Sequence, residues 1–138
     1  MRLELARSAG FCYGVRRAVQ MAEMAAEEGR PCVMLGPIIH NRDVVGSLAR
    51  QGLTAVDRVE DVPSGYGVII RSHGVSRHVY EILKERNVAV VDATCPFVKK
   101  IHRIVAEHSA AGEAVVIIGS PDHPEVEGIK GWGNEHTT

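Results

Sequence analysis

Two cysteines and three histidines are the residues of this chain whose types and settings favour chemistry. Cys12 lies in "AGFCYG", between two glycines, and Cys95 lies in "TCPFVK", directly before a proline. The histidines lie in the short motifs "PIIHN", "RSHG" and "DHPE", as His40, His73 and His123. Thiolates bind iron–sulfur clusters or zinc, and imidazoles bind metal ions or hold anions such as phosphates.

Each of these residues follows a strand-like run, and all but His123 precede a helix-like one. The strand-like runs are short and mostly apolar, and they cover residues 3–6, 32–36, 67–72, 88–93 and 114–119. The runs after the first contain β-branched residues. Helical spacing follows each of the first four runs, and glycines stand where three of these helices should stop, at Gly29, Gly52 and Gly112. The alternation predicts an α/β fold, an open parallel sheet of βα units with helices on both faces.

A parallel sheet brings all of these junctions to one edge, the carboxyl ends of its strands. Ligands bind at this edge, in crevices beside helix N-termini, where unpaired N–H groups favour thiolates, phosphates and carboxylates. We therefore expect Cys12, Cys95 and the three histidines to line one rim, with Glu125 beside them. Pro96 suits the first position of a helix, which places Cys95 just before that helix.

The other cysteine and histidines favour plainer roles. Cys32 lies within a strand, which predicts core packing. We expect His78, His102 and His108 on solvated helix surfaces and His136 in the tail. Asn41 and Ser76 are predicted helix-capping residues.

Composition excludes several classes of function. The chain has 138 residues, a formal net charge of -1 and 45% hydrophobic residues, so it offers no basic face for nucleic acid. No apolar run approaches the roughly 20 residues of a membrane span, and the N-terminus has no signal-peptide core. Three cysteines in such a chain do not indicate a disulfide framework. These features predict a cytoplasmic protein that binds neither membrane nor nucleic acid.

Five motifs in a fixed order resemble one family. "AGFCYGV", "LGPIIHN", "RSHGV", "DATCPFV" and "HPEVEG" closely resemble the 4-hydroxy-3-methylbut-2-enyl diphosphate reductases, the IspH or LytB family, from Leu3 to about Trp132. The family performs the last step of the methylerythritol phosphate route to isoprenoids. The resemblance implies reductive removal of the substrate hydroxyl group with two electrons, which gives isopentenyl and dimethylallyl diphosphates. Ferredoxin or flavodoxin is the electron donor that it implies.

The resemblance also implies roles for individual residues. Cys12 and Cys95 match ligands of a [4Fe-4S] cluster that has three cysteine ligands and one open iron. His40, His73 and His123 match the histidines that bind the substrate, and Glu125 matches the acid that supplies the proton. An open metal position acts as a Lewis acid, which an all-cysteine cluster would not.

The chain departs from the family in one respect. The family's third cysteine ligand falls beyond residue 138, and Cys32 does not match it. The family has three αβ domains, so we expect residues 1–94 to form the first and residues 95–138 to begin a second, truncated one. We expect the isolated chain to lack substantial reductase activity. Two other readings stay open: a cluster-free module that binds phosphate or diphosphate, and a zinc site built from cysteine and histidine.

Overall fold

The computed structural model describes residues 2–138, which contain one four-stranded parallel sheet. Its order is β2-β1-β3-β4. The strands are β1 (Cys32–Leu35), β2 (Thr54–Val56), β3 (Gly67–Ile70) and β4 (Val90–Asp92). The helices are α1 (Tyr13–Glu27), α2 (Arg42–Arg50), α3 (Arg77–Glu85), α4 (Pro96–Ala110) and α5 (Pro124–Lys130), with a 3-10 turn η1 (Val59–Asp61).

Helices cover both faces of the sheet, as the sequence predicts. Small residues of α1 and Leu48 of α2 pack with Met34 and Ile69 on one face. Leu83 of α3 and Val59 of η1 pack with Leu35, Val68 and Ile70 on the other face. Alternate residues of β1 and β3 therefore enter opposite cores, which is the pattern of a parallel sheet buried on both sides.

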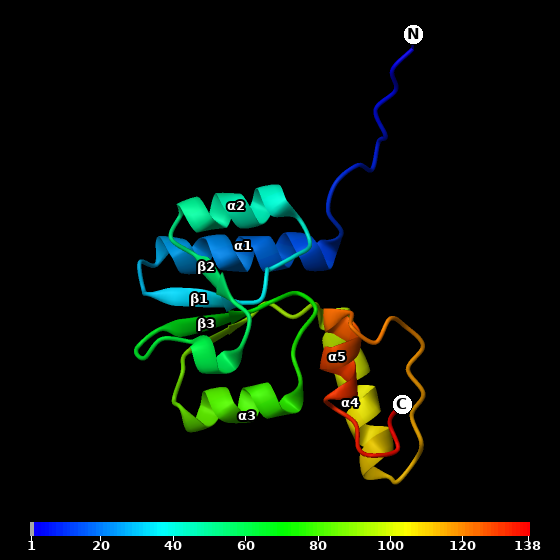
Figure 1. Cartoon of the computed structure of the whole chain (residues 1–138). Coiled ribbons are helices and arrows are strands. Elements are labelled where there is room, and N and C mark those ends of the chain that lie inside the picture. Colours follow the sequence, from blue (N-terminus) through cyan, green and yellow to red (C-terminus); the bar gives the residue numbers. More distant parts are fainter. Residues whose placement is uncertain (1) are drawn as a thin grey trace.

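The carboxyl edge of the sheet is where the chain changes direction. The helix after β1 lies on one face and the helix after β3 lies on the other, although these two strands are neighbours (Figure 1). Such a switch point opens a crevice between the two strand ends. The N-terminus of α1 lies at this edge, and α4 and α5 lie beyond it (Figure 1).

The predicted helix ends are confirmed. Gly29, Gly52 and Gly112 each have positive φ two residues after a helix ends. Asn41 caps α2, because its Oδ1 accepts hydrogen bonds from the backbone N–H groups of Asp43 and Val44 at 3.1 Å each. Ser76 is the N-cap residue of α3, as predicted, but its side chain makes no capping hydrogen bond.

Two predicted strands do not form. Residues 3–6 pair with nothing, and Leu3 and Leu5 are 83% and 92% exposed. Residues 114–119 make only one isolated bridge, from Val115 to Thr137, and Ile118 is 97% exposed. Both runs have strand-like composition, but neither meets a partner strand, and pairing rather than composition makes a strand.

The structure also adds elements that the pattern did not indicate. β2 has three residues, which is too short for an alternation to be visible, and it pairs in parallel with β1. α5 begins at Pro124, inside the motif that carries His123 and Glu125. The division of the chain at residues 94 and 95 stays a prediction. Within residues 2–138, no helix has the length and apolar character that crossing a bilayer requires.

Candidate active site at the carboxyl edge

Backbone hydrogen bonds continue past the strands and fix the junctions that carry the candidate residues. The Ala93 N–H donates to the Ile70 carbonyl at 3.1 Å, as the last rung next to β3 and β4. Beyond it, the Ser72 N–H donates to the Ile38 carbonyl at 3.1 Å, and the Cys95 N–H donates to the Ser72 carbonyl at 2.9 Å. The junctions after β1, β3 and β4 therefore form one connected backbone layer.

This layer and the start of α5 bring three predicted histidines together. The ring centroids of His40 and His73 are 4.5 Å apart. The His123 ring centroid lies 5.7 Å from that of His40 and 5.6 Å from that of His73. His40 comes from the loop after β1, His73 from the loop after β3, and His123 is the N-cap of α5. Three imidazoles from three separate segments thus share one small volume.

His73 is the least hydrated of the three. The pKa of His73 is lowered to about 4, mainly by burial and in addition by the charges of His40, Arg71 and His123. Its Nδ1 is buried and has no hydrogen-bond partner in the protein. A buried nitrogen without a partner is costly, so this atom indicates a place where a ligand would be stabilised.

His123 is held in a defined orientation by its own helix. Its Nδ1 accepts a hydrogen bond from the Glu125 backbone N–H at 3.2 Å. An imidazole nitrogen that accepts cannot carry a proton, so the proton of neutral His123 is on Nε2, which acts as a donor. Glu125 lies in the first turn of α5, two residues from this ring, and its side chain is half-buried.

A cavity of about 270 Å³ opens beside these rings. Its lining joins the loops after β1 and β3 to the segment that precedes α1: Phe11, Val15, Ile39, His40, Asn41, Ser72 and His73. Cys12 directly follows Phe11 in the sequence, so the segment that carries this cysteine borders the same space as His40 and His73.

The two predicted cysteines both stand at helix N-termini. Cys12 is the N-cap of α1 and is exposed, and Cys95 is the N-cap of α4 and is half-buried. A methyl group on Gly14 would lie 2.5 Å from the Cys95 Sγ, so α1 approaches this thiol closely because residue 14 has no side chain. Arg17 of α1 also donates from Nη1 to the Thr94 carbonyl at 3.2 Å. The two cysteine-bearing helix ends are therefore joined directly.

Two thiols in this setting fit part of a cluster-binding set. Neither cysteine side chain caps its helix, so both thiols are free to bind iron. Cys32, the third cysteine, starts β1 at the opposite edge and packs against the core, as predicted. Residues 2–138 contain no group of three histidine, cysteine or acidic side chains arranged to hold a metal ion. The role of Cys12 and Cys95 as cluster ligands stays a prediction.

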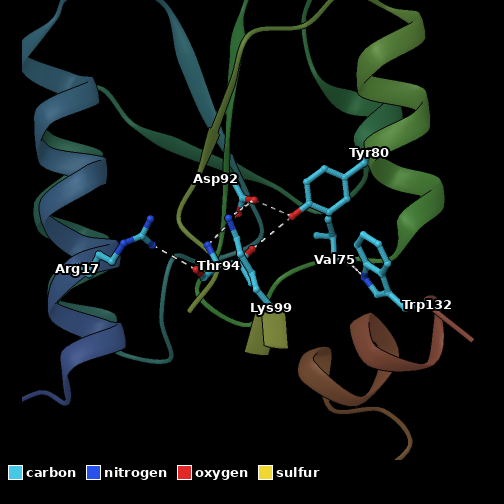
Figure 2. A network of polar contacts seen from close by, with 7 residues as sticks. All are labelled: Arg17, Val75, Tyr80, Asp92, Thr94, Lys99 and Trp132. Carbon is cyan, nitrogen blue, oxygen red and sulfur yellow. Dashed lines mark hydrogen bonds and ion pairs between the residues drawn. The ribbon is translucent and has the colours of Figure 1, made fainter. Parts of the chain in front are cut away.

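A buried polar network supports the Cys95 junction, and the sequence did not reveal it. Asp92 accepts hydrogen bonds from the Thr94 N–H at 3.0 Å and from the Tyr80 hydroxyl at 3.1 Å (Figure 2). The Lys99 ammonium lies 2.7 Å from the same carboxylate. Burial opposes ionisation of Asp92, but the hydrogen bonds from Lys99 and Thr94 outweigh it and lower the Asp92 pKa. The "VVDATCP" run carried one signal for this network, an acidic residue at the end of an apolar strand.

His102 departs from its prediction. It is 3% exposed rather than solvated, and its ring stacks on Trp132 with a centroid distance of 5.2 Å. Burial lowers the His102 pKa to about 4, so the ring is neutral and packs as an aromatic group. His78, His108 and His136 are exposed, as predicted.

The sheet order and the position of the site place this chain among open-sheet α/β proteins that carry their functional groups at the strand ends. A profile of one family, described as LytB protein, matches residues 3–138. The chain belongs to the LytB family.

Curated relatives and a solved structure are named as reductases of a hydroxymethylbutenyl diphosphate. The chain is 43% identical over 133 residues to 4-hydroxy-3-methylbut-2-enyl diphosphate reductase of Clostridioides difficile, covering 96% of this chain and 48% of the relative. It is 49% identical over 129 residues to the reductase of that name from Citrifermentans bemidjiense, covering 94% and 46%. The solved E-1-hydroxy-2-methyl-but-2-enyl-4-diphosphate reductase of Plasmodium falciparum superposes with a TM-score of 0.91 at 32% identity, covering 96% and 42%. The chain spans about half the length of the curated relatives it matches.

Proposed function

We propose that this chain is the part of a 4-hydroxy-3-methylbut-2-enyl diphosphate reductase that binds the substrate diphosphate and supplies two cluster thiolates. The observation that carries the proposal is the convergence of His40, His73 and His123, with ring centroids 4.5 to 5.7 Å apart, at the edge that also carries Cys12 and Cys95. The membership of the LytB family and the names of the relatives support it.

The three imidazoles suit a diphosphate. His123 presents an Nε2–H donor, because its Nδ1 is already occupied by the Glu125 N–H. His73 offers a buried Nδ1 without a partner, and a diphosphate oxygen would favour a proton on that nitrogen. His40 is exposed at the mouth of the site and adds a third donor. Binding of the diphosphate thus replaces an unsatisfied buried group with charge-assisted hydrogen bonds.

Glu125 is the proposed proton source. Its position in the first turn of α5, after His123, places the carboxyl group at the border of the diphosphate site. A nearby diphosphate disfavours the ionised carboxylate, which keeps the proton available for the departing hydroxyl group.

Cys12 and Cys95 would hold a [4Fe-4S] cluster with one open iron, and the remaining protein ligand is not among residues 2–138. When bound, the cluster supplies electrons and a Lewis-acidic iron for the substrate hydroxyl. The reaction breaks one carbon–oxygen bond, consumes two electrons and two protons, and releases water. Ferredoxin or flavodoxin is the proposed donor, and isopentenyl and dimethylallyl diphosphates are the proposed products.

Calorimetric titration with inorganic diphosphate tests the binding half of this proposal. We expect saturable binding by the chain, with losses of about tenfold or more in affinity for His40→Ala, His73→Ala and His123→Ala. His78→Ala is the matched control, because His78 is exposed on α3 and should leave the affinity unchanged. Equal affinity in all four variants would refute the histidine site.

Iron and acid-labile sulfide content after anaerobic reconstitution tests the cluster half. We expect iron to be lost in Cys12→Ser and Cys95→Ser and retained in Cys32→Ser, whose thiol lies at the opposite edge. Diphosphate binding without any iron uptake by the wild-type chain would favour the cluster-free module. The lack of a three-residue metal-ligating group in residues 2–138 is the observation that supports this second candidate.

A further inference from the structure

The segment that carries His123 and Glu125 packs closely against the loop that carries His73. α5 lies against the loop from His73 to Ser76, where a methyl group on Gly128 would lie 3.5 Å from the His73 carbonyl oxygen. A methyl group on Gly131 would overlap the Ser76 side chain. The close approach of two backbones therefore docks α5 directly on the loop that presents His73.

Trp132 adds side-chain contacts to this approach of the two backbones. Its indole N–H donates to the Val75 carbonyl at 2.9 Å, which ties the end of α5 to the His73 loop (Figure 2). The ring stacks on His102 of α4 and meets the Tyr80 ring of α3 edge-on at 5.8 Å. The Arg77 guanidinium lies 5.3 Å from its centroid. One side chain thus contacts the His73 loop and two helices at once.

We propose that Trp132 is a positioning residue for substrate binding, which holds His123 and Glu125 in register with His73. This inference rests on the proposed diphosphate site. Trp132 lines none of the cavity beside the imidazoles and acts only through the placement of α5. Without the indole, the end of α5 loses its hydrogen bond to the Val75 carbonyl and its aromatic contacts, and it keeps the bond that the Gly131 carbonyl accepts from the Arg77 N–H at 3.3 Å. His123 is then held less firmly within reach of a ligand that His73 binds.

A double-mutant cycle with inorganic diphosphate as the probe distinguishes positioning from a general loss of stability. We expect Trp132→Ala to weaken diphosphate binding about tenfold in the wild-type background and in the His40→Ala background. In the His123→Ala background we expect little further loss, because the group that Trp132 positions is already absent. Equal losses in all three backgrounds would overturn the proposal.

Trp132→Phe keeps an aromatic ring for the stack on His102 but lacks the N–H donor. We expect it to recover part of the affinity lost in Trp132→Ala, and it serves in the cycle should the alanine variant unfold. A phenylalanine variant indistinguishable from wild type in affinity and in amide exchange would overturn a role for the Val75 hydrogen bond.

Amide hydrogen exchange separates this inference from the proposed function. In Trp132→Phe we expect faster exchange in α5 than in wild type, with α1 and α2 unchanged. If the wild-type chain binds no diphosphate, the diphosphate site itself fails, and the exchange of α5 still decides whether Trp132 holds that helix. Unchanged protection of α5 in both Trp132→Phe and Trp132→Ala would refute the positioning role in either case.

Discussion

Imidazole side chains have contrasting environments in this molecule. His73 is half-buried among His40, His123 and Arg71, His102 is buried against Trp132, and burial lowers the pKa of both His73 and His102 to about 4. His78 is exposed on α3. At neutral pH the two buried rings are neutral, which leaves His73 ready to gain a proton only when an anion compensates it.

This difference predicts a specific pH dependence of stability. In the folded chain the pKa of His73 and of His102 is about 4, below the ordinary value of about 6.5. Between these two pH values the unfolded chain therefore binds more protons than the folded chain. Stability from these groups is therefore full above about pH 6.5 and falls as the pH drops toward 4, by at most about 1.4 kcal/mol per pH unit per group. Urea unfolding between pH 7.5 and 4.5 measures the slope. His102→Phe should flatten it and His78→Gln should not; an unchanged slope in His102→Phe would contradict the assignment.

The three cysteines predict an order of reactivity. Burial raises the pKa of the Cys32 thiol, and the charge of Glu28 raises it further, whereas Cys12 is exposed at the start of α1. Because the thiolate is the reactive form, Cys12 should react fastest with an aromatic disulfide reagent and Cys32 slowest. Mass spectrometry of partly labelled protein gives the order. Faster labelling of Cys32 than of Cys12 would show that β1 opens at its amino end.

At the scale of elements, the loop after β3 is the most tightly constrained part of the site. Gly74 has a φ of +72°, and a methyl group there would lie 2.6 Å from the His102 ring and 2.9 Å from the Thr94 side chain. Gly29, after α1, has a similar φ of +67° with nothing within 4 Å. A substitution at Gly29 therefore tests the backbone conformation alone, whereas one at Gly74 tests backbone conformation and packing together.

Alanine at each position should give different losses. Gly29→Ala should lower the folding stability by about 1–2 kcal/mol, from the backbone conformation alone. Gly74→Ala should lower it by about 3 kcal/mol or more in total, because the added methyl group also overpacks the loop. Denaturant unfolding measures both, and we expect only Gly74→Ala to weaken diphosphate binding. Equal destabilisation of the two variants would mean that His102 and Thr94 move aside freely.

The polar network of Asp92, Thr94, Tyr80 and Lys99 lies at the junction of β4 and α4, next to Cys95. Burial raises the pKa of Tyr80 to about 12, with the charge of Asp92 adding to it, although the hydrogen bond to Thr94 opposes the shift. Asp92→Asn removes the charge that Lys99 and Tyr80 share, so it should destabilise the fold by about 1–3 kcal/mol. Asp61→Asn, on exposed η1, is the control and should change stability by less than about 0.5 kcal/mol. A neutral result for Asp92→Asn would reduce the network to a surface contact.

Local patterns predicted the buried strands and helix ends because those features are encoded locally. The apolar runs of β1 and β3 and the glycines after three helices have this property. Residues 3–6 and 114–119 look like strands, but their pairing depends on distant segments. The burial of His102 was visible in the pattern, since it continues the face of α4 that Val98 and Val105 define. The prediction of a solvated surface for His102 followed from the polarity of histidine and not from its position on this face.

The site was predicted in part for the same reason. Parallel topology alone places strand ends at one edge, so the gathering of His40 and His73 followed once the strands were assigned. Trp132 and Arg17 were missed because their contacts, with Val75 and Thr94, join segments far apart in the sequence. No spacing rule connects such pairs.

At the scale of the whole molecule, apolar side chains remain on the surface beyond the sheet. Phe97 is 70% exposed, Val116 73% and Ile118 97%. Exposed apolar groups of this size favour association. We expect sedimentation coefficients that rise with protein concentration, and a smaller rise in the double variant Phe97→Ser, Ile118→Ser. A compact monomer at all concentrations would contradict this.

The contact between Gly14 and Cys95 constrains when, during synthesis and folding, the two thiols come together. The two thiols that border the site lie at opposite ends of the sheet-forming part of the chain, and the Cys95 junction is fixed only when β4 pairs with β3. During synthesis, Cys12 leaves the ribosome long before the backbone that will face it exists. Under the proposed function, cluster assembly on these two thiols therefore follows the closing of the sheet, and a delivery system that acts on the nascent chain would find only one of them in place.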